Sequence, residues 1–192
     1  MLSSGSQGPH GTLLQLMDAM VKTSPKTLVL GLGNAMLSDL GAGIEVIHRL
    51  RRRRPRPPDV DLVRVGLVNV SLAQVIGEYA NLIVVESRPV GGEAGTLMEL
   101  QGPRMDEFLA QQTGDDATLS DVLALLESDG HLPRQRALML MQPGSARVGH
   151  GLSRPVSEAL PEMIERVLVR AQDWNGRVCQ TPGASLVGSL PG

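Results

Sequence analysis

The sequence is poor in aromatic residues and cysteine, and it has no long apolar run. One Trp, one Tyr and one Phe among 192 residues leave the core to aliphatic side chains and nine Met, which fill irregular gaps. The single cysteine, Cys179, excludes an internal disulfide and a multi-cysteine metal site. No apolar run could span a bilayer, and the N-terminus lacks a basic region followed by an apolar one. We therefore expect a cytoplasmic protein with no membrane segment.

The chain also has no excess of positive charge, because 20 Asp and Glu residues outnumber 18 Lys and Arg residues and the formal net charge is -2 at pH 7. Such a chain has no global positive field to hold a polyanion. The exception is a run of arginines at residues 51–54, which follows a predicted helix. Cations suit the negative end of a helix dipole, and no aromatic residue lies among these arginines to stack on a base. The run is therefore interpreted as a solvated helix end, and no nucleic-acid partner is expected.

Apolar periodicity and breaker residues divide the chain into alternating strands and helices. Strands are predicted at residues 27–32, 60–65, 82–85, 96–100 and 137–141, and helices at 41–53, 70–79, 104–110, 119–126 and 155–171. This alternation predicts an α/β three-layer sandwich, in which helices cover both faces of a twisted, mostly parallel sheet of about five strands. We place this domain at residues 26–174. A flexible extension is predicted over 1–25, with a short amphipathic helix at 13–20, and a disordered tail over 175–192.

Parallel α/β sheets bind ligands outside the carboxyl ends of their strands, and three such turns carry polar residues. They hold Gly33, Asn34 and Asp39 after the first strand, Glu86 and Arg88 after the third buried strand, and Gln142, Arg147 and His150 after the last. Among the four histidines, His150 is the best placed, because Gly149 and Gly151 flank it behind a strand. His48 is expected at a core or boundary position of the first helix of the domain.

Residues 28–47 end a strand in Gly-x-Gly-Asn and continue into Asp-Leu-Gly-Ala-Gly. A dinucleotide-binding fingerprint requires glycine where Met36 stands, and the chain has no Gly-Lys-Ser/Thr sequence for a phosphate-binding Walker loop. Nucleotide binding is therefore disfavoured. Two interpretations of these glycines stay open at this point. They provide positive φ and close backbone approach, or they form a ligand-binding loop.

The ordered motifs of this chain resemble those of the nickel-iron hydrogenase maturation endopeptidases. The opening motif of that family, roughly Gly-x-Gly-Asn-x-Leu-x-x-Asp with a second acid and a later glycine, is matched by Gly31, Gly33, Asn34, Leu37, Asp39 and Gly43, with Gly41 in the same loop. The strand LIVVE at 82–86, the helix LSDVLALL at 119–126 and the run from Met141 to Gly151 keep the family order. The resemblance covers about residues 27–172.

This resemblance implies an aspartic-type endopeptidase that trims a C-terminal peptide from the large subunit of a nickel-iron hydrogenase after nickel has been inserted. In the family, three side chains are thought to engage the nickel. Those places hold Leu40 instead of the second acid, Glu86 instead of a strand-end Asp, and Asp115 instead of a loop His. Carboxylates suit nickel less well than imidazole does, so we expect nickel to be borne by the substrate and to bind the isolated protein weakly or not at all.

The resemblance predicts Glu86 and Asp39 as catalytic residues and Glu86 and Asp115 as metal ligands, with Asp116 and His150 as accessory candidates. The predicted partner is the precursor of a nickel-iron hydrogenase large subunit, and the protein is predicted to be a monomer. The alternative is a catalytically inactive relative, a pseudo-enzyme, that binds the large subunit or another maturation factor as a chaperone or adaptor. A third hypothesis is an unrelated small-molecule binder that uses the loop between Gly31 and Gly43.

Overall fold

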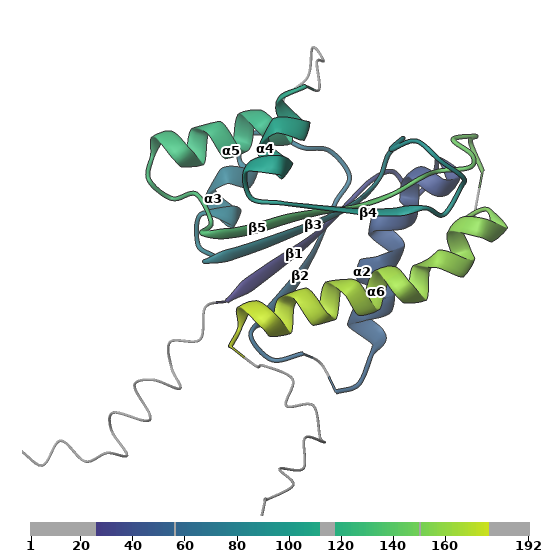
Figure 1. The fold of residues 1–192 in the computed structure, drawn as a ribbon, viewed down its shortest axis with the longest axis horizontal. Coiled ribbons are helices and arrows are strands. Elements are labelled where there is room, and N and C mark those ends of the chain that lie inside the picture. Colours follow the sequence, from purple (N-terminus) through teal and green to yellow (C-terminus); the bar gives the residue numbers. More distant parts are fainter. Residues whose placement is uncertain (1–25, 56, 112–117, 150, 177–192) are drawn as a thin grey trace, which may run out of the picture.

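A computed structural model describes residues 26–55, 57–111, 118–149 and 151–176 (Figure 1). The elements in chain order are β1 (Thr27–Leu32), the 3-10 helix η1 (Ser38–Gly41), α2 (Ala42–Arg52), β2 (Val60–Val65), α3 (Leu72–Ile76), β3 (Asn81–Ser87), β4 (Leu97–Gln101), α4 (Pro103–Ala110), α5 (Leu119–Ser128), β5 (Gln135–Met141) and α6 (Arg154–Trp174). The predicted extension with its helix at 13–20, and nearly all of the predicted tail, lie outside the described residues. Those two assignments stay predictions.

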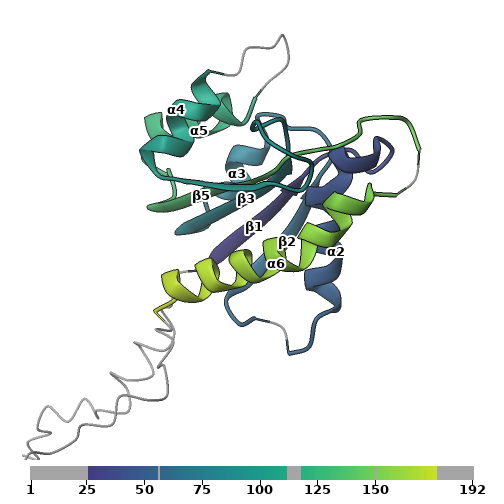
Figure 2. The ribbon, with the colours of Figure 1, turned by 45° about the vertical axis from the view of Figure 1, so that its right-hand side comes forward.

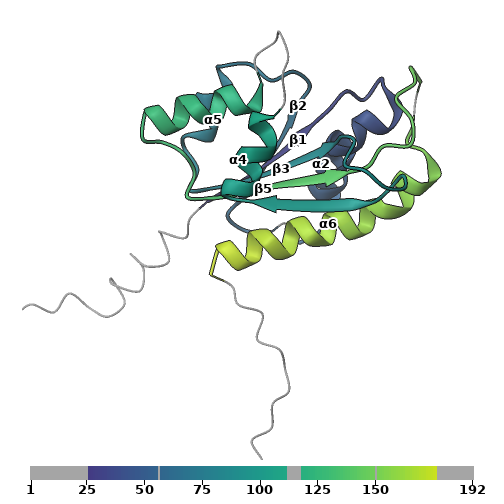
Figure 3. The same ribbon diagram turned by 45° about the horizontal axis from the view of Figure 1, so that its top comes forward.

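The strands form one sheet in the order β2-β1-β3-β5-β4. Its neighbouring pairs are parallel except that β4 runs antiparallel to β5. The helices α2 and α6 lie on one face of the sheet, and α3, α4 and α5 lie on the other (Figures 1 and 3). Every residue of β1 is buried, as expected for a central strand that is covered on both sides. The predicted α/β sandwich with a mostly parallel sheet is confirmed.

Alternate residues along each central strand point to opposite faces, and each set packs against its own group of helices. Leu30 of β1 joins the core under α3, α4 and α5, whereas its neighbour Val29 joins the core under α2 and α6. Leu82 and Val84 of β3 also face the first group of helices. Glu86 is next in this alternating series, which directs its side chain to the side of α4 and α5.

Two motif glycines let the first helix lie directly on the sheet. A Cβ on Gly43 of α2 would lie 2.3 Å from the carbonyl oxygen of Leu32 and 2.4 Å from that of Val85. A Cβ on Gly31 of β1 would lie 2.2 Å from the carbonyl oxygen of Gly43. The packing of α2 against β1 and β3 therefore excludes a side chain at either position. Close backbone approach is one role of the glycines in the opening motif.

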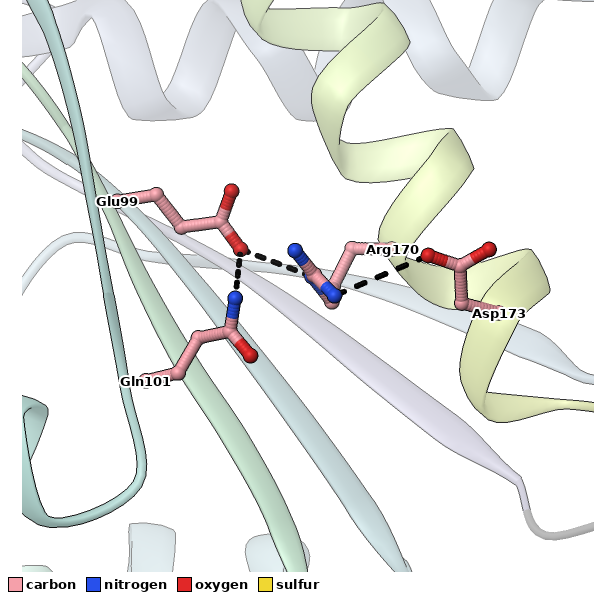
Figure 4. A network of polar contacts seen from close by, with 4 residues as sticks. All are labelled: Glu99, Gln101, Arg170 and Asp173. Carbon is pink, nitrogen blue, oxygen red and sulfur yellow. Dashed lines mark hydrogen bonds and ion pairs between the residues drawn. The ribbon is translucent and has the colours of Figure 1, made fainter.

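The edge strand β4 is held to α6 by a small network of polar side chains (Figure 4). Arg170 of α6 donates a hydrogen bond of 2.8 Å to Oε1 of Glu99, and Gln101 donates one of 2.8 Å to the same oxygen. Arg170 also lies 3.8 Å from Asp173, and its guanidinium is over the ring of Trp174. This half-buried network fixes the long last helix across the sheet (Figure 2).

Three local predictions about these elements are wrong. The strand β3 continues through Ser87 instead of ending at Val85, because its pairing with β5 extends that far. The helix predicted at 70–79 shortens to α3. The side chain of His48 is 51% exposed and lies 3.5 Å from Glu45 on the same helix, because α2 turns other residues toward the core. His48 is therefore a surface residue instead of a core or boundary residue.

The arginine run lies at the carboxyl end of α2 and is exposed, as its reading as a solvated helix end predicts. Arg51 donates a hydrogen bond to the carbonyl oxygen of Leu62, and Arg53 forms an ion pair with Glu165 of α6. Two arginines of the run therefore contact other parts of the same molecule. Within the parts of the chain that the structure describes, no helix is long and apolar enough to cross a membrane.

Candidate functional site

A cavity of about 520 Å³ opens at the carboxyl ends of β1, β2 and β3. Among the described residues that line it, the polar side chains are Asn34, Ser87, Thr118 and Ser120, the charged ones are Glu86 and Arg88, and the others are apolar. The volume falls in the range of about 300–1,000 Å³ that is typical of ligand pockets. Because open parallel sheets bind ligands at this edge, the cavity is the candidate functional site.

The turn that follows β1 brings Asn34 to the cavity. The Oδ1 atom of Asn34 accepts a hydrogen bond of 2.9 Å from the backbone N–H of Met36, and the backbone N–H of Asn34 donates one of 3.0 Å to the carbonyl oxygen of Leu40. Gly33 has a φ of 145°, and a Cβ there would lie 2.1 Å from the carbonyl oxygen of Leu40. The Gly-Asn pair of the motif is therefore required by the shape of this turn.

Glu86 is the acid among the described lining residues, and its side chain is 17% exposed. Its Oε1 accepts a hydrogen bond of 2.9 Å from the guanidinium of Arg88. Its Oε2 is buried and has no hydrogen-bond partner in the described part of the chain. A buried polar atom without a hydrogen-bond partner lowers the stability of the folded protein. Such an atom in a cavity is a candidate contact for a bound molecule.

The segment that carries Arg88 is fixed to the end of β5. The backbone N–H of Arg88 donates a hydrogen bond of 3.0 Å to the carbonyl oxygen of Met141, which also accepts one of 3.2 Å from the Ser87 hydroxyl. The side-chain oxygen of Gln142 accepts a hydrogen bond of 2.8 Å from the backbone N–H of Val90. These bonds hold the backbone on both sides of Arg88, so its side chain starts from a fixed position at the cavity.

Asp39 is fully buried and is not among the residues that line the cavity. Its Oδ2 accepts hydrogen bonds of 2.8 Å from the backbone N–H groups of Gly144 and Ser145 and of 2.7 Å from the Ser153 hydroxyl, and its Oδ1 accepts one of 2.6 Å from the Ser153 N–H. Burial alone would raise the pKa of Asp39, but the hydrogen bonds outweigh it and hold the pKa below its ordinary value of 3.8. The charged Asp39 therefore ties η1 to the loop between β5 and α6.

The structure thus brings three of the predicted site residues, Gly33, Asn34 and Glu86, to one cavity. Leu40, at the place of the second acid, adds an apolar wall to that cavity. Asp115, Asp116 and His150 lie outside the described residues, and their roles stay predictions, as does the catalytic role of Asp39. Among the residues that the structure describes, no group of three His, Cys, Asp or Glu side chains could hold a metal ion.

Sequence reasoning placed Arg88 at the right edge of the sheet but missed its pairing with Glu86. The signal was available, because residues two apart in an extended segment point to the same side. The partners of Asp39 had no such signal. Ser153 is 114 residues away from Asp39 in the chain, so only the tertiary fold brings them together.

The fold and the cavity define an α/β protein whose candidate site lies at the carboxyl edge of a twisted sheet. The sequence profile of the hydrogenase maturation protease family matches residues 44–170 of the chain. The expression/formation protein HupM of Azotobacter chroococcum is 31% identical over 148 residues, which is 73% of this chain and 69% of that protein. The expression/formation protein HupD of Rhizobium leguminosarum is 26% identical over 174 residues, which is 87% of this chain and 84% of that protein.

Solved structures agree with these sequence comparisons. The hydrogenase maturating endopeptidase HybD from Escherichia coli superposes with a TM-score of 0.72 at 25% identity, and the match covers 77% of this chain and 93% of that one. A hydrogenase maturation protease from Thermococcus kodakarensis, at 18% identity and a TM-score of 0.62, shares the fold. The chain belongs to the hydrogenase maturation protease family.

Proposed function

We propose that this chain is a protease that removes a C-terminal peptide from the nickel-loaded large-subunit precursor of a nickel-iron hydrogenase. Its relatives support the proposal, since one that is 25% identical over 150 residues is the hydrogenase 2 maturation protease of Escherichia coli. The observation that carries it is the cavity at the carboxyl edge of the sheet, where Glu86 of β3 and Asn34 of the turn after β1 both line the wall.

Glu86 is the acid that acts in this proposal, because it is the carboxylate among the residues described as lining the cavity. As a water oxygen bonds to the scissile carbonyl carbon, the Glu86 carboxylate accepts the proton of that water. The C–N bond then breaks, and Glu86 returns the proton to the departing nitrogen. Nickel is part of the substrate in this scheme and binds the isolated protein weakly or not at all.

Asp39 acts at a distance in this proposal. Its hydrogen bonds to Gly144, Ser145 and Ser153 hold the loop after β5 against the turn that carries Asn34. We therefore assign Asp39 as a positioning residue that keeps this rim of the site in place. We further propose that the protein acts as a cytoplasmic monomer.

The decisive experiment is to incubate the protein with purified, nickel-loaded large-subunit precursor and to follow the precursor by intact mass. The wild-type protein is expected to shorten the precursor at its C-terminus. Glu86→Gln keeps the size of the side chain but removes the base, so we expect trimming to slow by about 100-fold or more. Glu162→Gln is the matched control, because Glu162 is an exposed glutamate of α6 that also pairs with an arginine. The control is expected to trim at the wild-type rate.

Two results would contradict this proposal in different ways. A stable complex with the precursor but no trimming would identify the chain as an adaptor instead of a protease. Equal trimming by the wild-type protein and Glu86→Gln would leave the family assignment intact but remove Glu86 from the mechanism.

A further inference from the structure

The charges in the carboxyl-edge cavity cancel. Glu86 and Arg88 are the two charged side chains among the described lining residues, and they form an ion pair of 2.9 Å with each other. The surrounding walls come from apolar side chains such as Leu40, Val65 and Leu119. Among the described lining residues, the cavity therefore presents one negative and one positive side chain, which pair with each other and are surrounded by apolar side chains.

This pair has unused hydrogen-bonding capacity on both sides. Oε2 of Glu86 is a buried acceptor that has no partner in the described part of the chain. A guanidinium has five N–H donors, and within the described residues the Arg88 side chain makes one hydrogen bond, to Oε1 of Glu86. The Arg88 side chain is 27% exposed, so its remaining donors can be reached from the cavity. A free acceptor and free donors thus lie side by side.

A metal ion is a poor match for this arrangement. Arg88 already occupies one oxygen of Glu86, and its positive charge repels a cation that approaches the other oxygen. A peptide group is a better match, because it is neutral and carries one N–H donor and one C=O acceptor close together. The apolar walls can hold the side chain beside that peptide group.

We propose that Arg88 and Glu86 together bind a neutral peptide segment that carries an apolar side chain. Arg88 donates to a carbonyl oxygen of the segment, and Oε2 of Glu86 accepts a hydrogen bond from an N–H of the segment. Binding gives the unpaired oxygen a partner, and it needs no metal ion. Arg88 is therefore a substrate-binding residue of this chain. The inference rests on the proposed function only in taking the segment to be the C-terminal region of the hydrogenase large-subunit precursor.

The test is fluorescence polarisation with a labelled synthetic peptide that covers the C-terminal segment of the precursor. The wild-type protein is expected to bind it with the same Kd in EDTA and in added nickel chloride. Arg88→Met keeps much of the side-chain volume but removes every donor, so we expect the Kd to rise about tenfold to a hundredfold. Arg88→Lys keeps a charged donor and is expected to lose less.

The matched control is Arg166→Met, because Arg166 pairs with a glutamate on α6, which lies on the other face of the sheet. This variant is expected to bind the peptide as the wild-type protein does. Thermal unfolding shows whether Arg88→Met folds. If it does not, Arg88→Lys is used instead, and its trimming of the precursor is expected to show a higher KM without a matching fall in kcat.

Several outcomes would overturn the inference. They are an unchanged Kd in Arg88→Met, peptide binding that appears only with nickel, and no binding by the wild-type protein. The proposed function is tested separately by the trimming of the loaded precursor. Trimming with an unchanged Kd in Arg88→Met removes the inference alone. Arg88-dependent peptide binding without any trimming removes the proposed protease and leaves the inference in place.

Discussion

Replacing Asp39 by Asn exchanges one oxygen for an amide group, yet it should disturb a large part of the site. The Oδ2 atom accepts hydrogen bonds from two backbone N–H groups, those of Gly144 and Ser145, and from the Ser153 hydroxyl. An asparagine amide at that place directs N–H groups at N–H donors. The opposite rotamer would move the same conflict to the backbone N–H of Ser153. Neither orientation satisfies the loop.

The size of the effect follows from these contacts. Each hydrogen bond to a charged group contributes about 1.5–3 kcal/mol net, but bonds that share one carboxylate are not additive. Each buried donor that is left without an acceptor costs about 1–3 kcal/mol, and the amide leaves at least two donors in that state. We therefore expect Asp39→Asn to lower the free energy of unfolding by about 3–5 kcal/mol. That is a large part of the roughly 5–15 kcal/mol that stabilises an ordinary domain.

The assay combines urea denaturation with hydrogen exchange of the backbone amides. Denaturation gives the loss of free energy, and exchange shows whether Gly144, Ser145 and Ser153 lose protection before the rest of the domain. The control is Asp121→Asn, because the carboxylate of Asp121 also accepts hydrogen bonds at a helix start but is exposed. The control is expected to cost about 1 kcal/mol. A loss below about 1 kcal/mol in Asp39→Asn, with those three amides still protected, would refute the reasoning.

Two further predictions follow from the same contacts. Because the folded protein lowers the pKa of Asp39 from its ordinary 3.8, its contribution to stability is complete above that value and is lost as the pH falls through the lower folded pKa. The stability gap between the wild-type protein and Asp39→Asn should therefore narrow in acid, and a gap that stays constant down to about pH 2 would contradict this. Gly43→Ala should destabilise the protein by about 2 kcal/mol, because overpacking against the carbonyls of Leu32 and Val85 outweighs a gain of about 1 kcal/mol in helix propensity. Thermal unfolding measures this loss, and Gly66→Ala, with open space around its Cβ, should show almost none.

The particular elements that sequence reasoning located are those with a local signal. Residues 82–85, LIVV, are an uninterrupted apolar run, and they lie in the central strand β3, which is covered on both faces. The Gly-x-Gly-Asn turn and the glycines behind it also carried a local signal, since their backbone conformation and close approach tolerate little else. Both features can be recognised from residues that are neighbours in the chain, although the close approach of Gly43 to Val85 is a tertiary contact.

Sequence reasoning failed where orientation or a distant partner decides the outcome. His48 follows the buried Ile47 in an amphipathic helix. Successive residues of a helix point in different directions, so a small error in the assumed orientation of the helix exchanges a core position for a surface position. The hydrogen-bond partners of Asp39 carried no local signal either, because they are more than a hundred residues away in the chain, and its catalytic role stays a prediction.

The sequence by itself determined the α/β class, the positions of most strands and helices and the edge of the sheet that carries the site, because these depend on local periodicity and on short motifs. The tertiary structure alone decided which charges meet. It paired Glu86 with Arg88, left one oxygen of Glu86 without a partner among the described residues, and turned Asp39 away from the cavity. Pairing of charges depends on the distances and directions between side chains, and these exist only once the loops at the carboxyl edge have packed against one another.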